Sequence, residues 1–167
     1  MSELVRLRAH AKVNLALRVG APGVDGFHPL ATIFQTISLA DRLIARPLRA
    51  DESAKRLHTD VPIRFSVEGV PLPEHNTVTH AAALLTELLR SRGGTSLRPL
   101  SVHLKKRVPI GAGLGGGSSD AVAALVACAH LWSSDASPPS LEALADIARR
   151  VGADVPYFLA GGTALGT

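Results

Sequence analysis

The 167-residue sequence predicts a single mixed α/β domain in which strands and helices follow one another along the chain. Apolar and polar residues alternate from 5 to 19, whereas the apolar positions between 78 and 89 recur at helical spacing. Five glycines then lead directly into an alanine-rich segment. Hydrophobic residues make up 46% and charged residues 19% of the composition, which is typical of a folded globular chain. At this length one domain is the default.

The first stretch, residues 5–19, has an apolar residue or alanine at every odd position, so an extended chain with one buried face is expected. Because a strand usually has about 5–6 residues, an interruption or bend is expected within it. Lys12 and Asn14 fall on the polar face, away from the core. Turn-forming residues at 21–29 separate this stretch from a second apolar one, 30–39, which predicts an antiparallel pair. Alternation predicts two further strands, at 63–67 and 100–104.

Three helices are expected from apolar spacing and from residues that cap helix ends. They are expected to start after Asn76, at residues 118–120 and after Ser140, and to end before Gly93, near Leu131 and before Gly152. Residues 156–167 are apolar chain broken by a pair of glycines, and a last strand is expected there. The predicted order is therefore strands, helix, strand, glycine loop, helix, helix, strand.

Composition also excludes several classes of protein. No stretch approaches the ~20 consecutive apolar residues of a membrane span, and the N-terminus lacks the apolar middle of a signal peptide, so a cytoplasmic protein without membrane contacts is expected. The single cysteine, Cys128, lies in an apolar run, where an inert buried thiol is expected. The net charge of +4 suits a nucleoside triphosphate or a nucleic acid. Aromatic residues are only 4%, which disfavours stacking on nucleic acid bases.

Residues 108–120, VPIGAGLGGGSSD, are the most informative segment. Glycines let the backbone approach a ligand closely, and the first N–H groups of the following helix are unpaired, so the segment predicts an anion site. A Walker loop is excluded because Gly117 stands where that loop needs a lysine. A dinucleotide pattern matches at 111–116, but Pro109 and the turn-rich region that follows argue against NAD. A flexible turn or a tight packing point without a ligand is the alternative.

Four motifs occur in a recognisable order: AKVN at 11–14, DGFH at 25–28, the glycine segment at 109–119 and GADVP at 152–156. Together they resemble the 4-diphosphocytidyl-2-C-methyl-D-erythritol kinase family, a branch of the GHMP small-molecule kinases. The resemblance spans nearly the whole chain. It implies a two-layer α/β (α+β) fold, the GHMP-kinase N-terminal domain, which resembles the ribosomal protein S5 domain 2-like fold. We therefore expect residues 1–167 to be an ATP-binding N-terminal domain without the C-terminal α+β domain of that family.

The resemblance implies ATP-dependent phosphorylation of the 2-hydroxyl of 4-diphosphocytidyl-2-C-methyl-D-erythritol, in the non-mevalonate route to isoprenoids. Asp154 is the implied catalytic base, and Lys12 pairs with it and stabilises charge on the transferring group. Mg²⁺ is expected with ATP, and no protein ligand is assigned to it. The implied ATP-binding residues are Pro109, Gly111, Gly113, Leu114, Gly115, Gly116, Gly117, Ser118, Ser119, Asn76 and Lys106. The implied substrate-binding residues are Asn14, Phe27 and His28, with phenylalanine where the family commonly has tyrosine.

Two alternatives remain open from the sequence. Another GHMP kinase could act on a sugar, homoserine or a mevalonate-like alcohol, because the glycine segment serves ATP in all of them. A basic RNA-binding domain is the alternative from a different class, given the positive charge and the ribosomal-protein-like fold. No nucleic acid partner is expected, because basicity alone does not account for Lys12, the glycine segment and Asp154 together.

Overall fold

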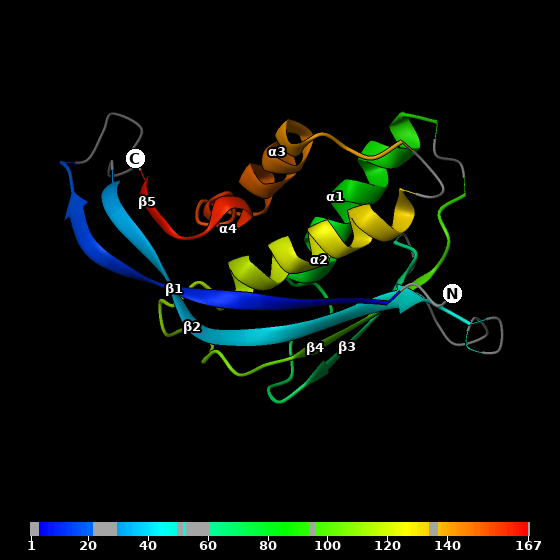
Figure 1. Cartoon of the computed structure of the whole chain (residues 1–167), viewed down its shortest axis with the longest axis horizontal. Coiled ribbons are helices and arrows are strands. Elements are labelled where there is room, and N and C mark those ends of the chain that lie inside the picture. Colours follow the sequence, from blue (N-terminus) through cyan, green and yellow to red (C-terminus); the bar gives the residue numbers. More distant parts are fainter. Residues whose placement is uncertain are drawn as a thin grey trace.

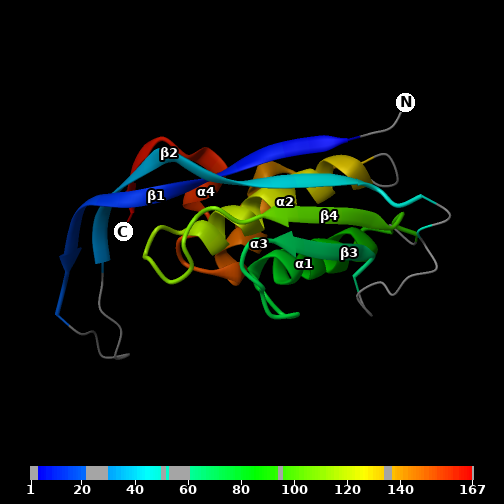
Figure 2. The same ribbon diagram turned by 90° about the horizontal axis from the view of Figure 1, so that it is seen from below.

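The computed structural model describes residues 4–21, 30–49, 52, 61–93, 96–133 and 137–166. It has two layers, a mixed β-sheet and a set of helices that cover one face of it (Figure 1, Figure 2). The elements are β1 (Val5–Val19), β2 (Leu30–Pro47), β3 (Ile63–Glu68), α1 (Thr77–Ser91), β4 (Leu100–Lys105), α2 (Gly116–Trp132), α3 (Leu141–Val151), α4 (Tyr157–Ala160) and β5 (Thr163–Gly166). The predicted two-layer fold and order of elements are confirmed, except that α4 lies where the sequence predicts extended chain.

The sheet order is β1-β2-β4-β3. The short strand β5 pairs with the N-terminal part of β2, whereas β4 pairs with its C-terminal part. β1, β4 and β5 all run antiparallel to β2, while β3 runs parallel to β4. The predicted antiparallel pair of the first two strands is therefore confirmed. β4 pairs with residues 42–47 of β2, and β5 pairs with residues 32–35. Between these segments, the edge of β2 that faces away from β1 contacts loops, through Thr36 and Asp41.

The ribbon formed by β1 and β2 bends at the middle of β1. His10 pairs with Ala40, but Lys12 pairs with Thr36, so residues 37–39 of β2 lie opposite a single residue of β1. Such bulges bend a strand and increase its twist, and Figure 1 shows the ribbon curving away from the sheet toward β5. The predicted bend is confirmed. It brings the far half of the ribbon beside α4 and the glycine segment.

The hydrophobic core lies between the sheet and the helices. α2 is its centre, because this helix packs against β1, β2 and α1 and is buried on most sides. Trp132 is fully buried, and its indole N–H donates to the carbonyl of Arg98 at 2.9 Å. Cys128 is buried as predicted, and burial raises the pKa of its thiol to about 12, so the thiolate is not formed near neutral pH.

The helix starts agree with the sequence at α1 and α3 but not at α2. Asn76 forms a capping box with Thr79 at the start of α1, and the Ser140 hydroxyl accepts from the backbone of Ala143 at the start of α3. For α2 the predicted cap at residues 118–120 is wrong. The helix begins at Gly116, and its N-cap is the left-handed Gly115, which makes no side-chain cap.

None of the helices in the described ranges is long and apolar enough to cross a membrane.

Candidate active site

Lys12 lies at the bend of β1 and is only 6% exposed. The register shift leaves two consecutive residues, Ala11 and Lys12, buried, so Lys12 is not a solvated surface charge. The ammonium donates a hydrogen bond to Asn14 Oδ1 at 2.6 Å and lies 5.3 Å from the ring centroid of Phe34. Lys12 and Asn14 do share a face, as predicted. The cation is thus held at a fixed place inside the bend.

Asp154 approaches Lys12 from the turn between α3 and α4. The Oδ2 of Asp154 lies 3.5 Å from the Nζ of Lys12, and the aspartate side chain is 41% exposed. The two residues implied as catalytic therefore come together from parts of the chain far apart in sequence. One charge is buried and the other remains open to a ligand.

The glycine segment forms an exposed loop before α2. Gly111, Gly113 and Gly115 have φ values of 74°, 71° and 68°, in the left-handed region that glycine adopts without strain. The first hydrogen bond of the helix runs from the N–H of Ser119 to the carbonyl of Gly115. The N–H groups of residues 116–118 precede that bond, so the helix itself does not use them. This geometry suits an anion, and contact with ATP stays a prediction.

The glycine loop is joined directly to the lysine. The backbone N–H of Lys12 donates to the carbonyl of Leu114 at 2.9 Å. A Cβ atom on Gly115 would lie 2.7 Å from the ring of Phe158 and 3.1 Å from the side chain of Lys12. Gly115 is therefore required both by its φ angle and by close packing. The loop, the lysine and the segment after Asp154 form one contiguous site.

A second, buried group of charges lies under the start of α2. The Nζ of Lys106 is 2.5 Å from Asp41 Oδ2 and 2.7 Å from Asp120 Oδ2, and all three side chains are almost fully buried. Asp41 also accepts hydrogen bonds from the backbone N–H groups of Arg107 and Val108. The cluster thus connects β2, the entry to the glycine loop and the first turns of α2.

Burial and hydrogen bonding act in opposite directions on the pKa values of Asp120 and Lys106. Burial raises the pKa of Asp120 to about 7, although the hydrogen bond from Lys106 acts in the opposite direction. Burial also disfavours the charge on Lys106, but its bonds to Asp120 and Asp41 outweigh this, so the pKa of Lys106 is raised. The Oδ1 of Asp120 is buried and has no hydrogen-bond partner in the described part of the chain. With its pKa at about 7, the Asp120 carboxyl is neutral in about half of the molecules near neutral pH, beside a charged Lys106.

The other site residues implied by the resemblance differ in where the structure places them and in what their side chains contact. Lys106 makes its contacts with the two carboxylates instead of an open surface, so an adenosine contact stays a prediction. Asn76 uses its side-chain oxygen for the cap of α1, and its role at the nucleotide is likewise untested. Asn14 donates to the hydroxyl of Thr32 at 2.7 Å beside Lys12. Phe27 and His28 lie outside the described residues.

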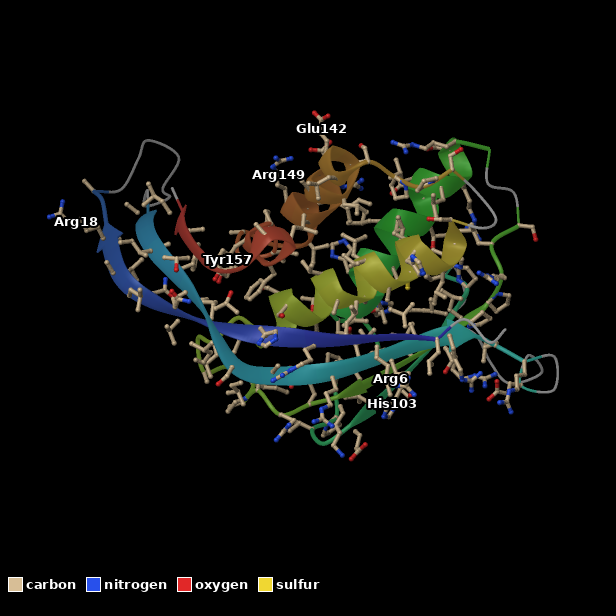
Figure 3. The ribbon with its side chains drawn as sticks, viewed as in Figure 1. Arg6, Arg18, His103, Glu142, Arg149 and Tyr157 are labelled. Atoms are coloured by element: carbon tan, nitrogen blue, oxygen red, sulfur yellow. The ribbon has the colours of Figure 1, made fainter. Side chains whose placement is uncertain are left out.

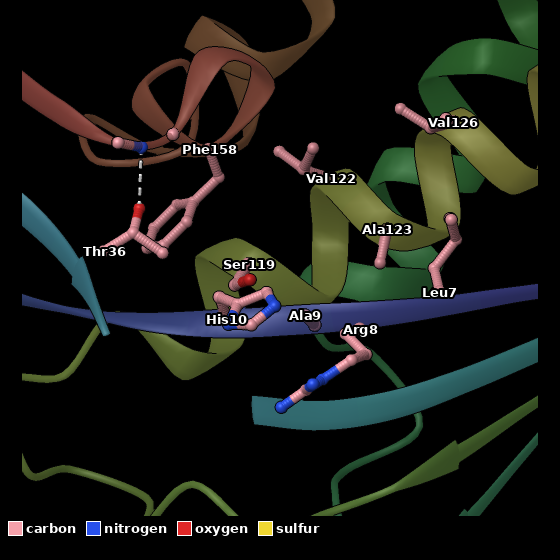
Figure 4. A pocket seen from close by; sticks show the side chains of 12 residues that line it. Leu7, Arg8, Ala9, His10, Thr36, Ser119, Val122, Ala123, Val126 and Phe158 are labelled. Atoms are coloured by element: carbon pink, nitrogen blue, oxygen red, sulfur yellow. Dashed lines mark hydrogen bonds between the residues drawn. The ribbon is translucent and has the colours of Figure 1, made fainter. Parts of the chain in front are cut away.

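Ser119 does not lie in the exposed part of the loop. It is 4% exposed and lines a pocket of about 240 Å³ between β1, α2 and the segment 158–162 (Figure 4). The walls of this pocket are mostly apolar, with Leu7, Val122 and Phe158 among them. Pro109 and Ser118, by contrast, lie at or near the surface with the glycines. No group of three or more His, Cys, Asp or Glu that could hold a metal ion occurs within the described ranges.

Several residues of the site have no signal in the sequence. Asp41 lies within a strand and Asp120 looks like a helix cap, yet both meet Lys106. Phe34 lies under the Lys12 ammonium, and Phe158 lies against the Cβ position of Gly115, and neither contact follows from spacing in the sequence. Sequence periodicity describes one helix or strand at a time, so it does not predict contacts between elements that are distant in the sequence.

Comparison with known proteins adds family and fold. Residues 76–162 match the family described as the GHMP kinases N terminal domain. A 4-diphosphocytidyl-2-C-methyl-D-erythritol kinase from a Nocardioides species is 45% identical over 96% of this chain and 50% of the relative. The protein of the same name from Kineococcus radiotolerans is 44% identical, over 98% of this chain and 46% of the relative. The chain therefore spans about half the length of the curated relatives it matches.

Solved structures agree with this result. A crystal structure of 4-(cytidine 5'-diphospho)-2C-methyl-D-erythritol kinase matches with a TM-score of 0.70 and 36% identity, over 97% of this chain and 52% of the other. A homoserine kinase from Cytophaga hutchinsonii matches with a TM-score of 0.67 and 21% identity, over 99% of this chain and 49% of the other. At that lower identity the likeness establishes the fold alone.

Proposed function

Because the chain belongs to the GHMP kinase family, whose N-terminal domain model matches residues 76–162, we propose that it carries the nucleotide-binding half of a kinase for 4-diphosphocytidyl-2-C-methyl-D-erythritol. The reaction moves the γ-phosphoryl group of ATP to the 2-hydroxyl of that substrate, in the non-mevalonate route to isoprenoids. Identity of 45% to a relative of that name supports the choice of substrate. The observation that carries the proposed chemistry is the Lys12–Asp154 pair beside the glycine loop, at 3.5 Å.

The glycine loop is the proposed binding site for the triphosphate. Its free N–H groups and the positive end of α2 would compensate the phosphate charge, in place of a Walker lysine. Mg²⁺ commonly binds phosphate oxygens and keeps several of its waters, so it would enter with ATP. No protein ligand is assigned to Mg²⁺, and the steps below do not depend on one.

Phosphoryl transfer mostly requires positioning and charge compensation. The exposed Asp154 carboxylate would accept a hydrogen bond from the acceptor hydroxyl and take its proton as the oxygen attacks the γ-phosphorus. The bond from that phosphorus to the bridging oxygen breaks, and ADP leaves with the electron pair. Lys12, fixed by Asn14 and by the carbonyl of Leu114, would compensate the charge that develops on the transferring group.

A product-mass assay with ATP and 4-diphosphocytidyl-2-C-methyl-D-erythritol tests this proposal. We expect one added phosphate, and at least a hundredfold lower kcat for Lys12→Met and for Asp154→Asn, since acid–base and electrostatic groups each supply about 10²–10⁴-fold. Lys105→Met is the matched control, because Lys105 is an exposed lysine that pairs with Glu68. Its kcat should stay within about twofold of the wild type.

Three outcomes would contradict the proposal. Faster phosphorylation of homoserine, a sugar or mevalonate would keep the kinase but change its substrate. Equal losses of kcat in the Lys105 and Lys12 variants would show that Lys12 has no specific role in catalysis. Salt-sensitive RNA binding without ATP binding would replace the kinase with a nucleic acid-binding protein.

A further inference from the structure

Tyr157 lies three residues after Asp154, at the start of α4, and faces the β2 ribbon (Figure 3). Its ring centroid is 4.8 Å from that of Phe34 and 5.0 Å from that of Phe158. Phe34 lies under the Lys12 ammonium, and Phe158 packs where a Cβ of Gly115 would be. The Tyr157 ring is therefore in contact with both aromatic neighbours of the site.

The Tyr157 hydroxyl takes part in a closed hydrogen-bond circuit with β2. Tyr157 donates to the carbonyl of Gly162 at 2.7 Å, and the N–H of Gly162 donates to the hydroxyl of Thr36 at 2.9 Å. The oxygens of Thr36 and Tyr157 are 2.8 Å apart. Because the tyrosine proton is directed at Gly162, the proton of this last bond comes from Thr36. Each hydroxyl thus donates once and accepts once, and the circuit allows one proton arrangement.

The Asp154 carboxylate, in contrast, has few contacts of its own, although the next residue, Val155, is buried in the core. The Asp154 side chain makes no hydrogen bond to the rest of the described chain, and its charged neighbour Lys12 is 3.5 Å away. The place of its carboxylate therefore depends on the backbone turn at 152–157. At its upstream end the turn is held by α3, where Gly152 N–H donates to Ala148. At its downstream end, the turn is connected to β2 by the Tyr157 side chain, whose hydroxyl contacts that of Thr36.

We propose that Tyr157 is a positioning residue, whose hydroxyl circuit with Thr36 holds the Asp154 carboxylate beside Lys12 and the acceptor hydroxyl. The inference rests on the proposed phosphoryl transfer, in which Asp154 is the base. A shift of about 1 Å at such a group can cost on the order of a hundredfold in rate. Loss of the circuit should therefore affect the chemical step more than the binding of ATP.

Tyr157→Phe removes the hydroxyl and keeps the ring packing. We expect kcat to fall about tenfold or more while KM for ATP changes less than about threefold. Thr36→Val breaks the same circuit from β2 and should give a similar fall, with no further loss in the double variant. Thr163→Val is the matched control, because it removes another hydroxyl bond to β2, the one to Gln35 at 2.6 Å, without a link to Asp154. An unchanged kcat in both circuit variants would overturn the proposal.

A general loss of stability could also lower kcat, so the decisive comparison is made in an Asp154→Asn background. If the hydroxyl acts through Asp154, Tyr157→Phe should have no further effect on the residual rate there. An equal fall in both backgrounds would show that Tyr157 acts on something other than Asp154, which overturns the positioning role.

Amide hydrogen exchange supplies a readout that does not need activity. In the wild type the N–H of Val155 donates to Gly152, and that of Phe158 donates to Val155. Both amides should exchange several-fold faster in Tyr157→Phe and Thr36→Val, and unchanged in Thr163→Val. Without turnover by the wild type, faster exchange would support the anchor while the proposed kinase function fails. Unchanged exchange would overturn the anchor itself.

Discussion

At the scale of single residues, Asp41, Lys106 and Asp120 form a buried group of two carboxylates and one ammonium. Fully ionised, the group would carry one net negative charge in the core, directly below a loop proposed to bind a triphosphate. Burial disfavours that state, and the raised pKa of Asp120, about 7, reflects it. A proton on Asp120 removes the excess charge and leaves one ion pair.

This titration predicts a pH-dependent stability. The pKa of Asp120 rises from 3.8 to about 7 on folding, so the folded state binds the extra proton between these values. Stability should therefore be higher at low pH and fall as the pH rises from about 4 to 7, by at most about 1.4 kcal/mol per unit. Asp120→Asn, which resembles the neutral carboxyl, should lack this slope. Urea unfolding at pH 5, 6, 7 and 8 gives the free energy of unfolding of both proteins. The prediction would be contradicted if this free energy changed with pH in the same way in the wild type and in Asp120→Asn.

Gly115 predicts a second effect at the same scale. Gly115→Ala adds a Cβ at positive φ and against Phe158 and Lys12, so it should both destabilise the fold and displace the lysine. Gly93→Ala is the control, because Gly93 has a φ of 92° but open space around its Cβ position. Gly93→Ala should cost about 1 kcal/mol of unfolding free energy, and Gly115→Ala clearly more. Denaturant unfolding and ATP titration check this, and equal losses in the two variants would show that packing at Gly115 is unimportant.

At the scale of elements, local signals predict local features. The caps of α1 and α3 could be identified from Asn76 and Ser140, because a cap involves only the next three residues. The start of α2 could not, since Gly115 takes its left-handed conformation where the loop packs on Lys12 and Phe158. The bend in β1 could be expected from strand length, but the bulge that buries Lys12 arises from the pairing with β2.

The cap of α1 gives a prediction for that element. The Asn76 side-chain oxygen accepts from two backbone N–H groups, and the backbone N–H of Asn76 donates to the Thr79 hydroxyl. The Ser140 hydroxyl accepts from only one backbone N–H group in the described part of the chain. Asn76→Ala should therefore cost about 1 kcal/mol of stability and Ser140→Ala less. Asn76→Ser should keep most of the cap. If Asn76→Ser nevertheless weakens ATP binding, the implied nucleotide contact gains support, while no stability loss in Asn76→Ala would contradict the capping role.

At the scale of the whole molecule, the site joins three distant segments. The Lys12–Asp154 pair was implied by family resemblance, and no spacing in the sequence gives their 3.5 Å separation. That proximity depends on the bend of the β1–β2 ribbon and on the return of the chain to β2 through α4 and β5. Sequence could therefore identify the chemical groups, whereas their geometry is a property of the assembled domain.

The bent end of the molecule also exposes apolar side chains. Leu15, Leu17 and Val19 of β1 are 62%, 53% and 59% exposed, and Leu165 of β5 is 73% exposed. The relatives of this chain are about twice as long. We therefore expect residues 1–167 alone to bind ATP weakly, turn over little or no substrate, and self-associate through the apolar end.

Light scattering and kinase assays on residues 1–167 and on a curated relative about twice as long test this expectation. The shorter chain should form larger species at micromolar concentration, and Leu15→Ser with Leu17→Ser should reduce them, because these side chains contribute little to the core at such exposure. Val126→Ser is the control. Val126 of α2 is also exposed, at 37%, but it lies near Leu7 in the first half of β1, away from residues 15–19 (Figure 4). Turnover by residues 1–167 equal to that of the longer relative would contradict the prediction and show that the site described above is sufficient for the reaction.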